Sequence, residues 1–199
     1  MNRAIVSLVC LIFLAVSLPA EAQTGFFDPN TKKWVTYTLT PEVAGKIARK
    51  KYKRKMVTYR GSEQPGTIVV DTKDKWLYHV QENGKAMRYG IGVGREGFTW
   101  NGTERVTAKR KWPGWTPPPE MIARERKKGI RLPSYMPGGP ENPMGARALY
   151  LGHTIYRIHG TNEDWSIGRA VSSGCIRMLN EDVKHLYERV KVGAKVKVL

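Results

Sequence analysis

Two segments decide the interpretation of this chain: IHGT at residues 158–161 and SSGCIRM at residues 172–178. They contain Cys175 and His159, the histidine best placed to activate that cysteine. A glycine adjoins each of the two residues, where backbone without a side chain can come close to a substrate. We interpret the pair as a Cys–His nucleophilic site, and the rest of the chain as the scaffold that positions it.

Most of the chain beyond residue 66 has the pattern of short strands. Asn83-Gly84 supplies the positive φ angles of a tight hairpin, and Gly152-His153 fits a two-residue turn with glycine first. Gly90, Gly92 and Gly94 alternate along one strand, which indicates a bulge or a close approach of backbone. Strands are predicted at residues 67–71, 76–80, 85–93, 105–112, 147–151, 154–159 and 195–199.

One helix is predicted near the C-terminal end. Val183, Leu186, Tyr187 and Val190 fall at i, i+3, i+4 and i+7 and form one apolar stripe, with Asn180 as the N-cap. Because strands dominate the domain, we expect a mainly β fold, a β-sandwich or a related two-sheet architecture.

Residues 112–146 lack the periodicity of a strand. The stretch is rich in proline and tryptophan and contains one short predicted helix, Glu120–Lys128. A connection this long is often a lid or a binding loop. The alternative is a surface loop packed by its own tryptophans.

The first 22 residues have the pattern of an export signal. Arg3 is followed by an apolar run at residues 4–18, then by Pro19 and by Ala20-Glu21-Ala22, an A-x-A cleavage motif. We predict cleavage after residue 22, export to an oxidising compartment and no transmembrane helix in the mature chain. An uncleaved N-terminal anchor is the alternative, although the run is short for a membrane span.

A basic extension is predicted at residues 23–66, ahead of a domain at residues 67–199. Thr40-Pro41 begins a helix, and seven of the ten residues from Lys46 to Lys55 are Lys or Arg. The whole chain has 34 Lys and Arg against 17 Asp and Glu, a formal charge of +17. The run is either a solvated helix face or a patch for an anionic wall or membrane. Export disfavours nucleic acid as the partner.

Four histidines could serve Cys175, which is left unpaired once the signal with Cys10 is removed. His185 lies off the apolar stripe of its helix and is expected to face solvent. The others are His153, at a turn tip, and His79, in the middle of a strand. His159 ends a strand, precedes a glycine and lies sixteen residues before the cysteine. It is therefore the preferred base, with a purely structural role as the alternative.

The pair needs an oxyanion donor and a group that orients the imidazole. The backbone N–H groups of Gly174 and Cys175 could bind an oxyanion. Glu163, Asp164 and the Gly160 carbonyl lie near His159 in sequence, and no acid is compellingly placed. Arg177 would share a face with Cys175 on a strand, where it could lower the thiol pKa, bind a substrate carboxylate or form a structural ion pair. No metal-ligand spacing and no G-x-S-x-G elbow is present.

These motifs resemble those of the L,D-transpeptidases of the YkuD (ErfK/YbiS/YcfS/YnhG) type. The similar segments are HGTN at 159–162, SIG at 166–168, VSSGCIRM at 171–178, NPMGARALYL at 142–151 and GTIVVD at 66–71. The resemblance covers residues 66–199. One departure is Ser173, where many relatives carry histidine, so the role of that histidine in substrate contact does not transfer.

The resemblance implies a β-sandwich in which Cys175 is the nucleophile, His159 the general base and acid, and the Gly160 carbonyl the group that orients the imidazole. Oxyanion and substrate contacts fall on Gly174, Ser173, Arg177, Thr161 and Asn162. The family needs no metal or organic cofactor. A reactive carbapenem is expected to acylate the same thiol.

The resemblance also implies the reaction. The thiol attacks the diaminopimelate carbonyl of a peptidoglycan stem tetrapeptide, and the terminal D-alanine leaves. The acceptor is a second diaminopimelate amine, giving a 3→3 cross-link, or an amine of an outer-membrane protein. With water the enzyme is an L,D-carboxypeptidase. The rivals are a non-catalytic wall-binding protein, a Cys–His peptidase that cuts another stem bond, and a basic surface module.

Overall fold

The computed structural model describes residues 25–28, 32–36 and 39–199, which fall into two compact units divided after Thr38. The first unit contains an antiparallel hairpin of β1 (Gly25–Asp28) and β2 (Lys33–Thr36). The predicted signal peptide at residues 1–22 lies outside the described residues. No helix in the described part of the chain is long and apolar enough to cross a membrane.

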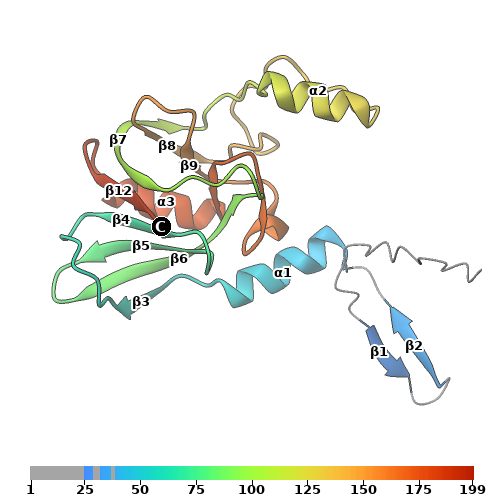
Figure 1. Ribbon diagram of the computed structural model, residues 1–199, viewed down its shortest axis with the longest axis horizontal. Helices are drawn as coiled ribbons and strands as arrows, with labels where there is room; N and C mark the ends of the chain where they lie inside the picture. The colour runs from blue at the N-terminus through green and yellow to red at the C-terminus, as the bar shows by residue number, and fades with distance from the viewer. Residues whose placement is uncertain (1–24, 29–31, 37–38) are drawn as a thin grey trace, which may run out of the picture. The chain divides into compact units, whose positions relative to one another are not determined.

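The second unit is built on one ten-stranded sheet (Figure 1). Its strands are β3 (Lys55–Thr58), β4 (Ile68–Asp71), β5 (Trp76–Gln81), β6 (Lys85–Gly94), β7 (Gly102–Lys111), β8 (Arg147–Leu151), β9 (Arg157–His159), β10 (Ala170–Ser172), β11 (Ile176–Met178) and β12 (Lys195–Val198). Its helices are α1 (Pro41–Lys51), α2 (Pro119–Lys127), the 3-10 turn η1 (Asp164–Ser166) and α3 (Asn180–Arg189). The mainly β prediction is confirmed.

The sheet closes on itself through β6. The hydrogen-bonded order runs β6-β11-β9-β8-β7-β12-β4-β5, and β5 pairs again with β6. The β5–β6 hairpin turns at Asn83 and Gly84, whose φ angles of 58° and 63° are those predicted for this dipeptide. Two layers of strands therefore face each other across one core, as a sandwich or flattened barrel requires.

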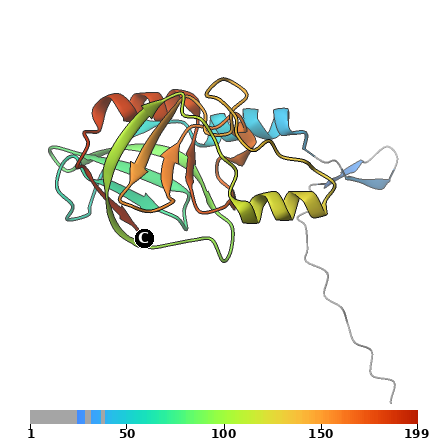
Figure 2. The same cartoon turned by 90° about the horizontal axis from the view of Figure 1, so that it is seen from above.

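The predicted stripe of α3 enters this core. Val183, Leu186 and Val190 are buried in the same cluster as the strand residues. In Figure 2, α3 lies against the strands, whereas α2, which has no buried residue, stands away from them. Burial of an apolar face against the sheet, rather than helix propensity, accounts for the position of α3.

Two predictions about α3 are wrong. The helix begins at Asn180 with Leu179 as N-cap, because the Asn180 side chain bonds elsewhere: its Oδ1 accepts the Ala146 N–H over 2.8 Å. His185 is half-buried rather than solvent-facing, with Nδ1 2.8 Å from the Tyr89 hydroxyl. Burial lowers the pKa of His185 to about 4.

The predicted two-residue turn at Gly152-His153 is also wrong. Gly152 has the positive φ of 55° that a turn needs, but the connection extends to residue 156. Thr154 holds this wider turn, because its Oγ1 donates to the Leu151 carbonyl over 2.6 Å and accepts the Tyr156 N–H over 3.0 Å. The return strand therefore begins at Arg157.

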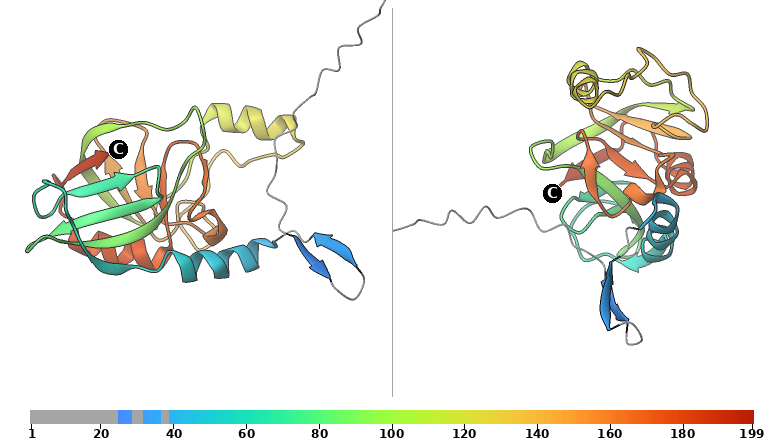
Figure 3. Two further views of the ribbon diagram at one scale, coloured as in Figure 1. Left: turned by 60° about the horizontal axis from the view of Figure 1, so that its bottom comes forward. Right: turned by 90° about the vertical axis from the view of Figure 1, so that its right-hand side faces the viewer.

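The second unit begins at Leu39, so much of the predicted extension packs on the sheet. Thr40 caps α1 as predicted, with its Oγ1 accepting the Val43 N–H over 3.3 Å. β3 pairs with β6. Figure 3 shows α1 and α2 on opposite sides of one end of the sheet. Non-local pairing of this kind leaves no local sequence signal.

Tyr52, at the end of α1, explains two of the glycines. Its ring lies 5.0 Å from the Trp76 ring, and Tyr52 is only 9% exposed. A Cβ on Gly90 or on Gly168 would lie 2.2 Å from Tyr52 atoms. The close approach predicted for the glycines of β6 is thus confirmed at Gly90, where α1 contacts the sheet.

The basic run does more than cover a surface. Arg49 bonds Asp164 of η1 with Nε at 2.8 Å and pairs with Glu181 at 2.6 Å. Arg54 pairs with the buried Asp182 at 2.7 Å. Arg49 therefore attaches α1 to η1 and α3, and Arg54, which follows the helix, adds a second attachment to α3.

Replacing Tyr52 with alanine should lower the free energy of unfolding by about 3 kcal/mol, because a large buried aromatic leaves a cavity between α1 and the sheet. Urea denaturation measures the change. Tyr135, which is 59% exposed, is the matched control, and Tyr135→Ala should change stability by less than about 0.5 kcal/mol. Equal effects of the two substitutions would show that α1 is not part of the cooperative domain.

Candidate active site

β9 and β11 run parallel and side by side, with Ile158 opposite Ile176 and His159 opposite Arg177. Continuing this register by one residue places Arg157 beside Cys175. Side chains alternate along a strand, so the two isoleucines point to the core and the other four residues share the opposite face. These four residues all line one cleft. The predicted Cys175 and His159 therefore line the same cleft, and the Cys175 Sγ–H donates to the Ile155 carbonyl over 3.8 Å.

The cleft has a volume of about 760 Å³. One wall is formed by the 112–146 segment, including α2, which begins and ends one residue before its predicted limits. Trp115, Pro117 and Met121 lie on this wall, and Ile155 lies near the thiol. The long connection thus flanks the Cys–His pair, as a lid or binding loop would.

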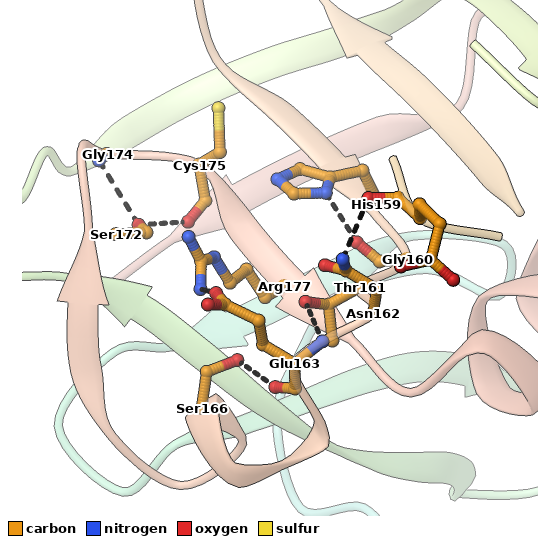
Figure 4. A network of polar contacts seen from close by, with 11 residues as sticks. His159, Gly160, Thr161, Asn162, Glu163, Ser166, Ser172, Gly174, Cys175 and Arg177 are labelled. Carbon is orange, nitrogen blue, oxygen red and sulfur yellow. Dashed lines mark hydrogen bonds and ion pairs between the residues drawn. The ribbon is translucent and has the colours of Figure 1, made fainter. Parts of the chain in front are cut away.

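His159 is buried and held by its neighbour in sequence. Its Nδ1–H donates to the Gly160 carbonyl oxygen over 2.5 Å, as the dashed line in Figure 4 shows. Burial, and then the charge of Arg177, lower the pKa of His159 to about 3. The imidazole is therefore neutral near pH 7, and its Nε2 carries the lone pair that can accept a proton.

The two nearby acids have other partners. Asp164 pairs with Arg49, and Glu163 pairs with Arg177 at 2.7 Å. Of the three groups considered from the sequence, the Gly160 carbonyl is the one bonded to the ring.

The Cys175 thiol is free and half-buried. Burial raises its pKa, and the backbone and charge of Arg157 offset part of this effect. The resting site thus contains an uncharged thiol beside an uncharged imidazole. Attack by sulfur then requires His159 to remove the proton as the new bond forms.

Ser172, which is not among the predicted site residues, shapes the turn before the cysteine. Its Oγ accepts the Gly174 N–H over 3.2 Å and donates to the Cys175 carbonyl over 2.6 Å. Gly174 has a φ of 105°, and a Cβ there would lie 2.7 Å from the Tyr156 ring. Because the Gly174 N–H is already bonded, the Cys175 N–H is the better candidate for the oxyanion donor. A serine two residues before a glycine is a weak signal for such a turn.

The remaining predicted residues surround the pair. Thr161 is buried, and its Oγ1 accepts the Glu163 N–H over 3.0 Å. The Nδ2 of Asn162 donates to the Glu141 carbonyl over 2.9 Å. Ser173 and Asn162 line the cleft. Thr161 and Asn162 thus fix the loop after His159.

Two asparagines that are not among the predicted site residues bond backbone groups of the 112–146 segment. The Nδ2 of the buried Asn142 donates to the Met136 and Pro137 carbonyls, and its Oδ1 accepts the Met144 N–H. Asn180 bonds the next stretch at Ala146. A buried asparagine with three backbone partners has no periodic sequence signal, so spacing could not identify it.

The fold and the site together define a class of protein: a closed, mainly β domain with a cysteine and a histidine in one cleft. The chain belongs to the YkuD family: the model of the L,D-transpeptidase catalytic domain matches residues 65–198. The resemblance seen in the motifs is thereby confirmed.

Curated relatives support the same family. The probable L,D-transpeptidases ErfK/SrfK and YbiS of Escherichia coli K12 are 39% and 40% identical over 135 and 136 residues, 66% and 67% of this chain. The chain spans only 43% and 44% of the length of those two proteins.

Two solved structures are similar. A Brucella melitensis protein described as a probable carnitine operon oxidoreductase is 47% identical, with a TM-score of 0.50 over 75% of this chain and 94% of that one. An L,D-transpeptidase from Mycobacterium smegmatis is 20% identical, with a TM-score of 0.50 over 67% of this chain and 58% of that one, and it supports the fold alone.

Alkylation of Cys175 by iodoacetamide should rise steadily from pH 5 to pH 9, by about tenfold per pH unit, because only the small thiolate fraction reacts. Mass spectrometry of the Cys175 peptide measures the rate constants, and Cys175→Ser is the unlabelled control. A fast rate that is constant between pH 5 and pH 7 would instead show a preformed thiolate–imidazolium pair.

Proposed function

We propose that the protein is a peptidoglycan L,D-transpeptidase that works through an acyl-enzyme on Cys175. The observation that supports this most directly is the position of His159 in the same cleft as the thiol, with Nδ1 bonded to the Gly160 carbonyl, which leaves Nε2 to accept a proton. Family membership supplies the reaction class.

In the first half-reaction, Nε2 of His159 accepts the thiol proton while Sγ attacks the diaminopimelate carbonyl of a stem tetrapeptide. The tetrahedral oxyanion is held by the Cys175 N–H and its turn. The carbon–nitrogen bond then breaks, His159 returns the proton to the departing amine, and D-alanine leaves. A thioester remains on Cys175.

In the second half-reaction, an acceptor amine loses a proton to His159 and attacks the thioester. The proton passes back to sulfur and restores the thiol. Because the His159 pKa is held low, its protonated form gives the proton up readily in both halves. The Gly160 carbonyl keeps the ring oriented throughout.

The acceptor is a diaminopimelate amine or an amine of an outer-membrane protein. Water in its place would make the enzyme an L,D-carboxypeptidase, and loss of chemistry would leave a wall-binding protein. The proposal includes Asn162, Ser173 and Arg177, which line the cleft, as substrate contacts, with the buried Thr161 holding the loop beside them. It also includes no cofactor, and carbapenem acylation of the thiol.

The proposed setting is the periplasm, reached through a signal peptide at residues 1–22. The catalytic domain is residues 67–199, with α1 and β3 of the basic extension packed on it. A charge of +17 would hold the protein on the carboxylate-rich wall. Binding to insoluble peptidoglycan should then weaken as salt rises.

Mixing the protein with disaccharide-tetrapeptide should give a mass gain equal to the substrate minus D-alanine, with D-alanine released. Cys175→Ala should show neither. His159→Gln, which replaces the ring by a neutral amide, should slow release by about 10²- to 10⁴-fold because the base is lost. Intact-protein mass spectrometry and D-alanine assay measure both effects.

Circular dichroism is the control that each variant is folded. Folded wild-type protein with a reactive thiol, no adduct and no D-alanine would favour the wall-binding function. A shortened stem without free D-alanine would indicate a peptidase that cuts another bond.

A further inference from the structure

The ionisable groups of the cleft are largely paired with one another. Arg124 pairs with Glu125 at 3.0 Å, and Arg177 pairs with Glu163 at 2.7 Å. Two charged residues of the lining remain, Arg157 and Glu120. Glu120 is exposed in the first turn of α2. Arg157 is therefore the cationic group of the inner cleft that no carboxylate of the described residues neutralises within ion-pair distance.

The strand register places Arg157 at the reacting atoms. It lies next to Cys175 across the β9–β11 pair and two residues before His159 on the same face. Arg157 is half-buried, and its guanidinium carbon lies 5.2 Å from the Tyr150 ring centroid. Contact with a ring face restricts the side chain while leaving its donors available. The result is a positioned guanidinium beside the thiol.

We propose, on the basis of the proposed function, that Arg157 binds the carboxylate of the terminal D-alanine of the stem peptide. Only one carbon separates that carboxylate from the nitrogen of the bond that breaks. A guanidinium beside Cys175 can therefore hold the carboxylate through two parallel hydrogen bonds while the adjacent carbonyl lies at the sulfur. Arg157 would then select stems that end one residue after diaminopimelate.

Arg177 is the less suitable receptor, although the motif draws attention to it. Its Nη1 already bonds the Glu163 carboxylate, and Glu163 is itself fixed through its backbone N–H to Thr161 and its carbonyl to Ser166. Glu163 thus already neutralises the charge of Arg177, although the buried Nε of Arg177 has no partner among the described residues. Arg177 instead lies beside His159 in the register, where its charge opposes protonation of the imidazole.

The test compares two substrates, the tetrapeptide ending in D-alanine and the same peptide ending in D-alaninamide, which lacks the negative charge. The wild-type kcat/KM should favour the carboxylate by about 10- to 100-fold, the range for a hydrogen bond to a charged group. Arg157→Gln should bring this ratio close to one, mainly by lowering kcat/KM for the peptide that ends in the D-alanine carboxylate. Arg157→Lys should keep part of it, and Arg177→Gln should keep most of it.

Liquid chromatography–mass spectrometry of the released amino acid or amide follows both substrates. A wild-type ratio near one, or a ratio that survives in folded Arg157→Gln, would overturn the inference and leave the transpeptidase proposal standing. If Arg157→Gln slowed release from both substrates equally and shifted the pH profile, the inference would also be overturned, because Arg157 would then act on the thiol alone. Release from neither substrate by the wild-type protein would reject the proposed function itself.

Discussion

The site depends on the parallel register between β9 and β11. Ile158 and Ile176 are at most 2% exposed, and their burial fixes which residues of each strand point to the core. A slip of one residue on either strand would exchange the faces and remove a reacting group from the cleft. Parallel neighbours need a long connection, and the residues between His159 and Cys175 form it, with η1 and β10 inside. The parallel pairing thus accounts for a long separation between His159 and Cys175 in the sequence.

Burial keeps both partners of the pair neutral, and the neighbouring positive charges act on them in opposite ways. The buried imidazole lies beside Arg177, and the thiol lies beside Arg157, so protonating His159 is costly while a thiolate gains only partial compensation for its burial. Such a pair lacks a permanently activated nucleophile. It can transfer one proton within the transition state and return it, which suits the two successive acyl transfers proposed for this thiol. The Glu163–Arg177 pair limits how strongly positive the cleft becomes.

Sequence patterns predicted the features that depend on neighbours in the chain. The Asn83-Gly84 hairpin, the Thr40 cap and the α3 stripe follow from local backbone and side-chain geometry, and all three are found. Two of the wrong predictions involve partners far along the chain: Asn180 bonds Ala146 instead of capping its helix, and His185 bonds Tyr89 instead of facing water. The third is local, because Thr154 bonds Leu151 and Tyr156 and widens the turn after Gly152. Arg157 was missed for the same reason as the first two, since its place beside Cys175 exists only once two strands are paired. Cys175 and His159 could be placed together from the sequence because a glycine adjoins each and only a short separation divides them, and they do line one cleft.

The basic extension shows how a surface feature can also support the site. Arg49 of α1 bonds Asp164 in η1, and η1 belongs to the connection between His159 and Cys175. The preceding residue, Glu163, holds Arg177, which in turn lies beside the imidazole. A continuous series of ion pairs and packed backbone therefore runs from α1 to the base. The exposed lysines of the same run are not part of this series and remain available to an anionic surface. The two predicted alternatives, a solvated face or a patch for an anionic surface, thus concern the lysines of the run, whereas Arg49 and Arg54 have structural partners.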